Sequence, residues 1–204
     1  MLSGKTVLPW LFSVAGVPGF FTGLLVPLRE SGSMLPQAAL TPWVVSHPAR
    51  KRLWVLGSVG QGLCAAIIAA AAVLVDGPLL GLIVCLALAA LAVLRALCSL
   101  TGKDVQGRTI SKGHRGVVTG RATQLGGAVT LITGGILAVL GELPRWGLAA
   151  LLAIGAATWF LAAAVFRTIE EPVPDDAGQK CLNRSWWTDT WKLYTQDSRF
   201  RSFV

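Results

Sequence analysis

Charged residues are missing from long stretches of this chain, and these stretches most constrain what it can fold into. No Asp, Glu, Lys or Arg occurs in residues 8–28, 53–75, 122–141 or 146–166. A helix rises ~1.5 Å per residue, so each stretch is long enough to cross a bilayer core of ~30 Å. Only 14% of the residues are charged, against about 25% in soluble domains. The sequence therefore predicts an all-α integral membrane protein.

Two weaker apolar segments bring the predicted number of membrane spans to six. Residues 31–46 are uncharged but short, and residues 79–94 are uncharged up to Arg95. We expect spans at about 8–28, 30–46, 53–75, 79–102, 117–140 and 146–166. Residues 167–204 are polar, and their second half interleaves aromatic and basic side chains, as in an amphipathic segment at a membrane surface. The predicted fold is a six-transmembrane-helix bundle followed by a cytoplasmic linker.

Basic residues gather in alternate loops of this predicted bundle. Loops 47–52 and 103–115 contain Arg50, Lys51, Arg52, Lys103, Arg108, Lys112 and Arg115, whereas the other loops contain only Arg29 and Arg145. Because cytoplasmic loops carry an excess of Lys and Arg, both termini are predicted to lie in the cytoplasm, with the bundle in the plasma membrane. This placement accounts for the net charge of +8, so we expect the lipid bilayer as a partner and no nucleic acid.

The sequence contains no arrangement of side chains typical of an enzyme or a metal site. Cys64, Cys85 and Cys98 lie in apolar segments without a C-x-x-C pair. His47 and His114 lie in separate loops without neighbouring carboxylates. We therefore expect no cofactor and no catalytic activity. A membrane-embedded enzyme acting on lipid and a non-catalytic membrane scaffold or assembly subunit are the alternatives to a transporter.

Two predicted cytoplasmic loops suggest a family. The turn at residues 46–52 (SHPARKR) joins spans two and three, and the motif Arg115-Gly116-x-x-x-Gly120 opens span five. With the linker after span six, these features resemble the N-terminal half of a major facilitator superfamily transporter. The turn lacks the aspartate of the family's signature, and Ala49 stands where a glycine is usual.

The resemblance implies a secondary active transporter that moves a small molecule by alternating access. A second six-helix half, from the same polypeptide or another copy, would enclose the substrate near the midplane. Proton coupling is an option, and the end of the chain soon after the linker predicts a truncation before a seventh helix. The resemblance also implies a cytoplasmic gating role for the residues of the two loops. These residues are Arg50, Lys51, Arg52, Arg115, Gly116 and Gly120.

Polar residues within or beside the spans are the candidates for substrate binding or coupling. They are Arg29, Glu30, Gln37, Arg95, Arg121 and Gln124. A charge at membrane depth is costly unless it is paired or hydrated, which favours a cavity for Arg95 over snorkelling to the headgroups. For Arg29 and Glu30, a cavity and a tight external turn are equally open. Glu30 is the candidate for a protonatable coupling group.

Three further patterns predict helix contacts. In span five, Gly120, Thr123, Gly127, Thr130 and Gly134 form a seam of small residues that we expect to pack closely against a neighbouring helix. Gln61, among glycines of span three, is expected to make an interhelical hydrogen bond. Asp104 and Arg108 are spaced for an ion pair along one helix.

Overall fold

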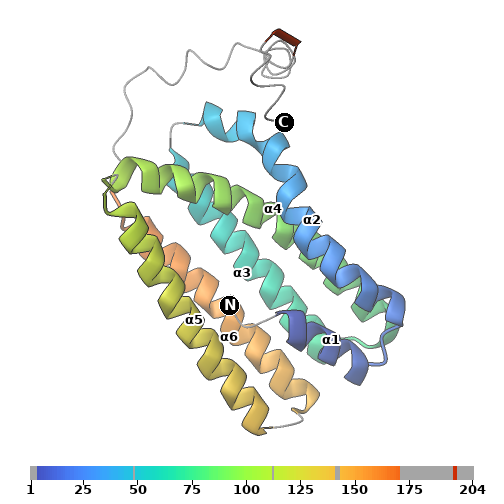
Figure 1. The fold of residues 1–204 in the computed structure, drawn as a ribbon. Helices are drawn as coiled ribbons and strands as arrows, with labels where there is room; N and C mark the ends of the chain where they lie inside the picture. Colours follow the sequence, from blue (N-terminus) through green and yellow to red (C-terminus); the bar gives the residue numbers. More distant parts are fainter. Residues whose placement is uncertain (1–3, 48, 112, 141–142, 171–194, 197–204) are drawn as a thin grey trace.

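The computed structural model describes residues 4–47, 49–111, 113–140, 143–170 and 195–196 (Figure 1). The described part is 89% helix and contains no strand. Its helices are α1 (Gly4–Val14), α2 (Gly19–Ser46), α3 (Arg50–Leu74), α4 (Gly77–Thr109), α5 (Arg115–Leu140) and α6 (Arg145–Arg167). The all-α class is therefore confirmed. Most of the predicted C-terminal linker, including the amphipathic segment, lies outside the described residues.

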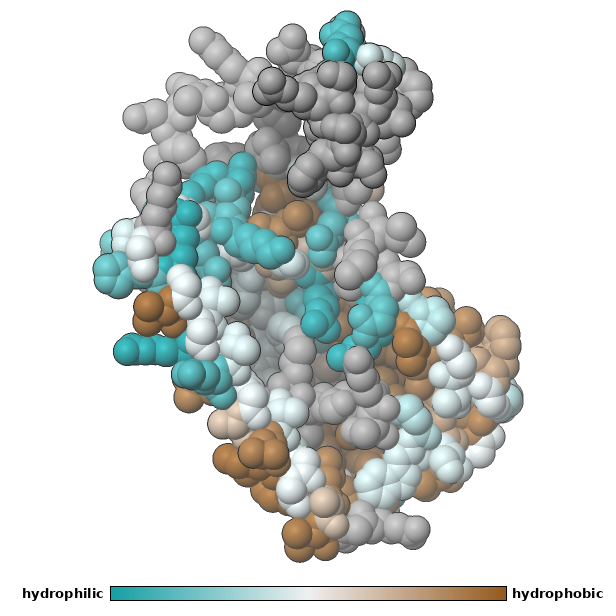
Figure 2. Space-filling model, viewed as in Figure 1, coloured by the Kyte–Doolittle hydropathy of each residue, from teal (hydrophilic) through white to brown (hydrophobic). Residues whose placement is uncertain are grey.

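Four helices, α3 to α6, are long and apolar enough to cross a membrane. They coincide closely with the last four predicted spans. At 33 residues, α4 is about 50 Å long and extends beyond a bilayer core. Figure 2 shows hydrophilic side chains gathered over the upper half of the molecule, around the end of α4 and the start of α5. Apolar side chains cover the lower end of α5 and the lower right of the molecule, near α1 and α2, an arrangement compatible with a membrane protein.

The first two predicted spans, 8–28 and 30–46, are wrong in their boundaries. The chain does not turn at Arg29 and Glu30, because α2 runs unbroken through both residues for 28 residues. The turn lies earlier, where Gly16 has a φ of +65° and Pro18 is the N-cap of α2. A left-handed glycine followed by a proline ends a helix, whereas two charged side chains do not. As a result α1 has only 11 residues, about 16 Å, too short to cross a bilayer core.

Helix α3 lies at the centre of the bundle, in contact with α4 on one side and α6 on the other. The Ser58 hydroxyl donates to the carbonyl of Trp159 in α6 at 3.0 Å. Gln61 Nε2 lies 3.2 Å from Cys98 Sγ in α4, which confirms the predicted interhelical hydrogen bond. A Cβ added at Gly57 would lie 2.7 Å from Cys98 Sγ. Glycine thus allows α4 to approach this closely.

Helix α5 lies at the edge of the bundle (Figure 1) and is packed differently. None of its described residues is buried. A Cβ added at Gly120, Gly127 or Gly134 would meet nothing within 4 Å. The predicted close packing of the small-residue seam is therefore wrong for the described part of this chain. The small residues do lie at helical spacing on α5, but no other helix among the described residues lies against them.

The start of α3 and the ends of α4 and α6 meet at one end of the bundle, which we call the basic end. Arg50 of α3 forms an ion pair with Asp104 of α4. Asp104 also lies 3.1 Å from Arg108, which confirms the predicted pair along α4. Lys51 Nζ donates to the carbonyl of Ile169 after α6 at 2.7 Å. The two most basic loops therefore lie at the same end of the molecule, as the alternation of charge predicts.

Candidate solute-binding cavity

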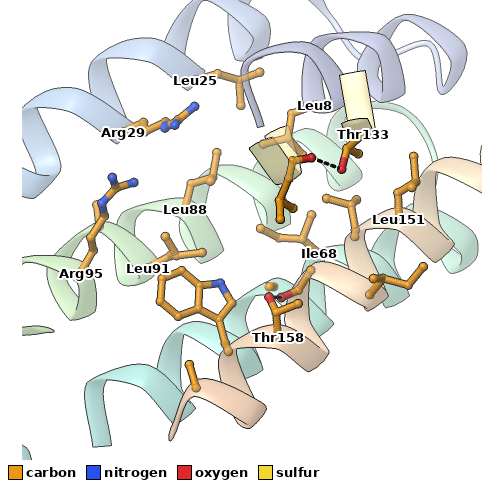
Figure 3. Close-up of a pocket in the computed structure, with 18 residues that line it drawn as sticks. Leu8, Leu25, Arg29, Ile68, Leu88, Leu91, Arg95, Thr133, Leu151 and Thr158 are labelled. Atoms are coloured by element: carbon orange, nitrogen blue, oxygen red, sulfur yellow. Dashed lines mark hydrogen bonds between the residues drawn. The ribbon is translucent and has the colours of Figure 1, made fainter. Parts of the chain in front are cut away.

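A cavity of about 460 Å³ lies inside the bundle, and each of the six helices contributes to its wall (Figure 3). It is lined by Leu8, Leu25, Arg29, Ala65, Ile68, Leu88, Leu91, Ala92, Arg95, Val129, Thr133, Leu151, Leu152, Ile154, Gly155, Thr158, Trp159 and Ala162. Its volume falls within the range of about 300–1,000 Å³ that is common for small-molecule sites. The cavity is therefore large enough for a small organic solute.

Two arginines supply all the charge of the described cavity wall. Figure 3 shows the guanidinium groups of Arg29, from α2, and Arg95, from α4, at the same end of the cavity. Both residues are half-buried, and Arg29 Nη1 is buried without a hydrogen-bond partner. Among the described residues, neither guanidinium forms an ion pair. This end of the cavity therefore carries positive charge that no described carboxylate neutralises.

The depth of these arginines follows from the helices that carry them. Arg29 lies about 15 Å along α2, and Arg95 lies about 27 Å along α4, counted from the first residue of each helix. Because α2 continues past Arg29, the alternative of a tight external turn is wrong. Both arginines line the cavity instead, Arg95 among apolar residues of α4 and Arg29 after the apolar residues 24–28 of α2. An unpaired charge in such a place is costly, which marks it as a functional candidate.

The rest of the cavity is almost entirely apolar. Figure 3 shows Ile68, Leu88 and Leu151 along its length, beyond the two arginines. Hydroxyl groups come from Thr133 and Thr158, but both donate to backbone carbonyls of their own helices. Thr133 donates to the carbonyl of Val129 at 2.7 Å, and Thr158 donates to that of Gly155 at 2.6 Å. The described wall contains no acidic side chain. The cavity thus offers a cationic end and an apolar body.

The other predicted substrate or coupling residues are not among the described residues of the wall. Glu30 is exposed on α2, and Gln37 is partly buried further along that helix. Arg121 and Gln124 are exposed on α5. Successive helical residues are rotated by about 100°, so Glu30 cannot share the direction of Arg29. Sequence proximity to Arg29 was therefore a poor guide to cavity position.

Three of the predicted gating residues hold elements together at the basic end. Arg50 pairs with Asp104, Lys51 donates to the residue 169 carbonyl, and Arg115 Nε donates to the carbonyl of Ile110 at 2.9 Å. The other three, Arg52, Gly116 and Gly120, are exposed. These contacts tie α3 to α4 and to the segment after α6, and they tie the start of α5 to the end of α4. A gating role stays a prediction.

Several cavity residues carried no signal in the sequence. Ile68, Leu151, Thr158 and Trp159 belong to uninterrupted apolar runs, and nothing in the runs distinguishes a wall residue from a lipid-facing one. The approach of Arg29 to Arg95 also had no signal, because the two residues lie on separate helices. Only the packing of α2 on α4 brings them to one end of a cavity.

No protein-family model, curated protein or solved structure matches this chain. The functional argument therefore rests on the cavity and on the helices around it. Membership of the major facilitator superfamily stays a prediction from the loop motifs.

Proposed function

We propose that this chain is the solute-binding half of a secondary active transporter, of the kind that its loop motifs resemble. The observation that carries the proposal is the cavity with Arg29 and Arg95 in its wall. A polar or charged group inside an apolar helix bundle is retained at a cost, and solute pathways are the usual reason for it. Alternating access would expose this cavity first to one side of the membrane and then to the other.

The outer surface supports a membrane location for this function. Large apolar side chains point outward from the helices that could span, with exposed fractions of 61% for Leu56, 63% for Leu86 and 77% for Leu131. Large apolar residues are exposed along each of these four helices, and extended exposed apolar surface is rare in soluble monomers. A lipid bilayer would cover it. A second six-helix half is part of the proposal, since alternating access of this type requires two bundles around the solute.

Cysteine accessibility tests the proposed function without knowledge of the solute. Ala92 of α4 lines the cavity and is 2% exposed in this conformation, so a thiol there reacts only when the cavity opens. Ala90 of the same helix is exposed on the outside. The full chain carrying Ala92→Cys is placed in sealed vesicles and treated with a membrane-impermeant methanethiosulfonate from either side. We expect labelling from both sides, because alternating access opens the cavity to each in turn.

Ala90→Cys is the matched control, and Cys181, which lies outside the described residues, is replaced by Ser in every chain tested. We expect no labelling of the control above that of the Cys181→Ser chain, whose Cys64, Cys85 and Cys98 are buried. Labelling of Ala92→Cys from one side alone would contradict alternating access. Protection from both sides would contradict a solute cavity and favour a closed scaffold.

A further inference from the structure

The unpaired arginines restrict the charge of any molecule that occupies the cavity. Arg29 Nη1 has no hydrogen-bond partner, and the described wall contains no carboxylate that could neutralise either guanidinium. Two like charges at one end of a low-dielectric cavity repel each other and also repel a cationic solute. An anion bound at this end would reduce the repulsion between the two guanidiniums and would give Arg29 Nη1 a hydrogen-bond acceptor. The charge of this end of the cavity therefore favours an anion over a neutral or cationic group.

The shape of the guanidinium group narrows the choice of anion. Its planar array of N–H donors matches the two oxygens of a carboxylate or the oxygens of a phosphate. The two groups come from different helices, α2 and α4, and Figure 3 shows both at the same end of the cavity, which places an anionic head at this end beside guanidinium donors of two helices. This arrangement suits a compact oxyanion at the end of a molecule.

The opposite end of the cavity restricts the body of the molecule. Its wall is aliphatic at Ile68, Leu88 and Leu151, and the hydroxyl hydrogens of Thr133 and Thr158 are already donated to backbone carbonyls. The Thr hydroxyl oxygens and the Trp159 indole N–H are the few hydrogen-bonding groups left there, so a sugar or another polyol would replace only a small part of its hydrogen bonds to water. An alkyl or other apolar group would instead gain from burial.

We infer that the cavity binds an amphipathic anion, with one carboxylate or phosphate head between Arg29 and Arg95 and an apolar body along Ile68 and Leu151. This inference rests on the proposed function, since it assigns the solute class of the same cavity. The molecule could arrive from water as a free solute or from the bilayer as an anionic lipid. Both share the chemistry of an oxyanion joined to an apolar chain.

Calorimetric titration of the full chain in phosphatidylcholine nanodiscs tests this inference, with empty nanodiscs as the reference. The probes share one chain length: octyl phosphate, octanoate, octanol and octyltrimethylammonium. We expect the two anions to bind at least about tenfold more tightly than the alcohol and the cation, because charge-assisted hydrogen bonds are worth at least that factor. Equal or tighter binding of octyltrimethylammonium would overturn the inference without any variant.

Variants then assign the binding to the two arginines. We expect Arg29→Gln and Arg95→Gln each to lower the binding affinity for octyl phosphate by about tenfold or more. Arg29→Lys should retain part of the affinity, because a point charge replaces the planar fork. Arg167→Gln is the matched control, since Arg167 is exposed in the last turn of α6. The affinity of this variant for octyl phosphate should equal that of the native chain. Unchanged affinity in both cavity variants, with native helix content by circular dichroism, would overturn the inference.

Nanodiscs that contain phosphatidylglycerol distinguish the two sources of the anion. If octyl phosphate then binds more weakly to the native chain but not to Arg29→Gln, the lipid headgroup competes for the cavity. If its affinity is unchanged, the cavity takes a free solute. Labelling of Ala92→Cys from both sides together with no anion preference would leave the transporter proposal standing and reject the solute class alone.

Discussion

Helices α3 and α5 both carry glycines at helical spacing, yet they stand in opposite environments. In α3, a Cβ at Gly60 would lie 2.8 Å from Leu94, and one at Gly62 would lie 3.0 Å from Phe160. In α5, the same addition at Gly120 or Gly127 would meet open space. A pattern of small residues thus permits close helix contact but does not create it. A neighbour must also present a matching face, as α4 and α6 do for α3.

The cavity lies between the tightly packed helix α3 and the loosely packed helix α5. Its walls from α3, α4 and α6 belong to the tightly packed part of the bundle, and α5 contributes only Val129 and Thr133 among the described wall residues. Since no described residue of α5 is buried, displacement of this helix would break few contacts. A firm wall on one side and a lightly held wall on the other suits a cavity that must open.

The largest difference between the two helices is expected for a branched side chain. Gly57→Val in α3 would place Cβ 2.7 Å from Cys98 Sγ and 3.2 Å from the carbonyl oxygen of Leu94. Because a backbone atom is involved, we expect destabilisation of about 3 kcal/mol. Gly127→Val in α5 is the control, with an expected change below about 1 kcal/mol, the scale of helix propensity. Unfolding in mixed detergent micelles measures both, and equal losses would show that α5 is packed as tightly as α3.

A smaller loss of stability is expected from substitutions at the end of α3 opposite the basic end. Arg145 of α6 donates to the carbonyls of Ala72 and Val75 and pairs with Asp76. Arg145→Gln removes these contacts, and we expect a loss of about 2 kcal/mol, since hydrogen bonds to a charged group are involved. Asp76→Asn removes only the ion pair, and with Asp76 71% exposed its loss should stay below about 1 kcal/mol. If Asp76→Asn is as harmful as Arg145→Gln, the carbonyl contacts do not hold α6 to α3.

The smallest effect is a slight gain in stability in α5. Gly127→Ala adds a Cβ that meets nothing, while alanine favours the helix over glycine by about 0.5–1 kcal/mol. We therefore expect a small increase in the detergent midpoint of unfolding. Gly57→Ala in α3 should instead lower it, because its Cβ would lie against Cys98. A loss at Gly127 would reveal a close neighbour for this face of α5.

Much of the fold followed from local sequence, because it depends on the solvent that each segment prefers. The four long apolar spans from α3 onward, the Gln61 contact with Cys98 and the pair of Asp104 with Arg108 are all seen in the structure. The N-terminal turn lies earlier than predicted, because the backbone of Gly16 and Pro18 ends the helix there and the charges of Arg29 and Glu30 do not. Charge sets the cost of a position in a membrane, but backbone geometry decides where a helix ends.

The sequence by itself determined that this chain forms long apolar helices with its basic loops at one end. Helix length, hydropathy and loop charge depend on residues that are neighbours in the sequence, so they can be predicted from the sequence alone. Only the tertiary structure decided that Arg29 and Arg95 share a cavity while Glu30, Arg121 and Gln124 do not line its described wall. The direction of a side chain relative to other helices depends on how α2 packs on α4 and how α3 packs on α6. That packing is a property of distant contacts, which no local pattern records.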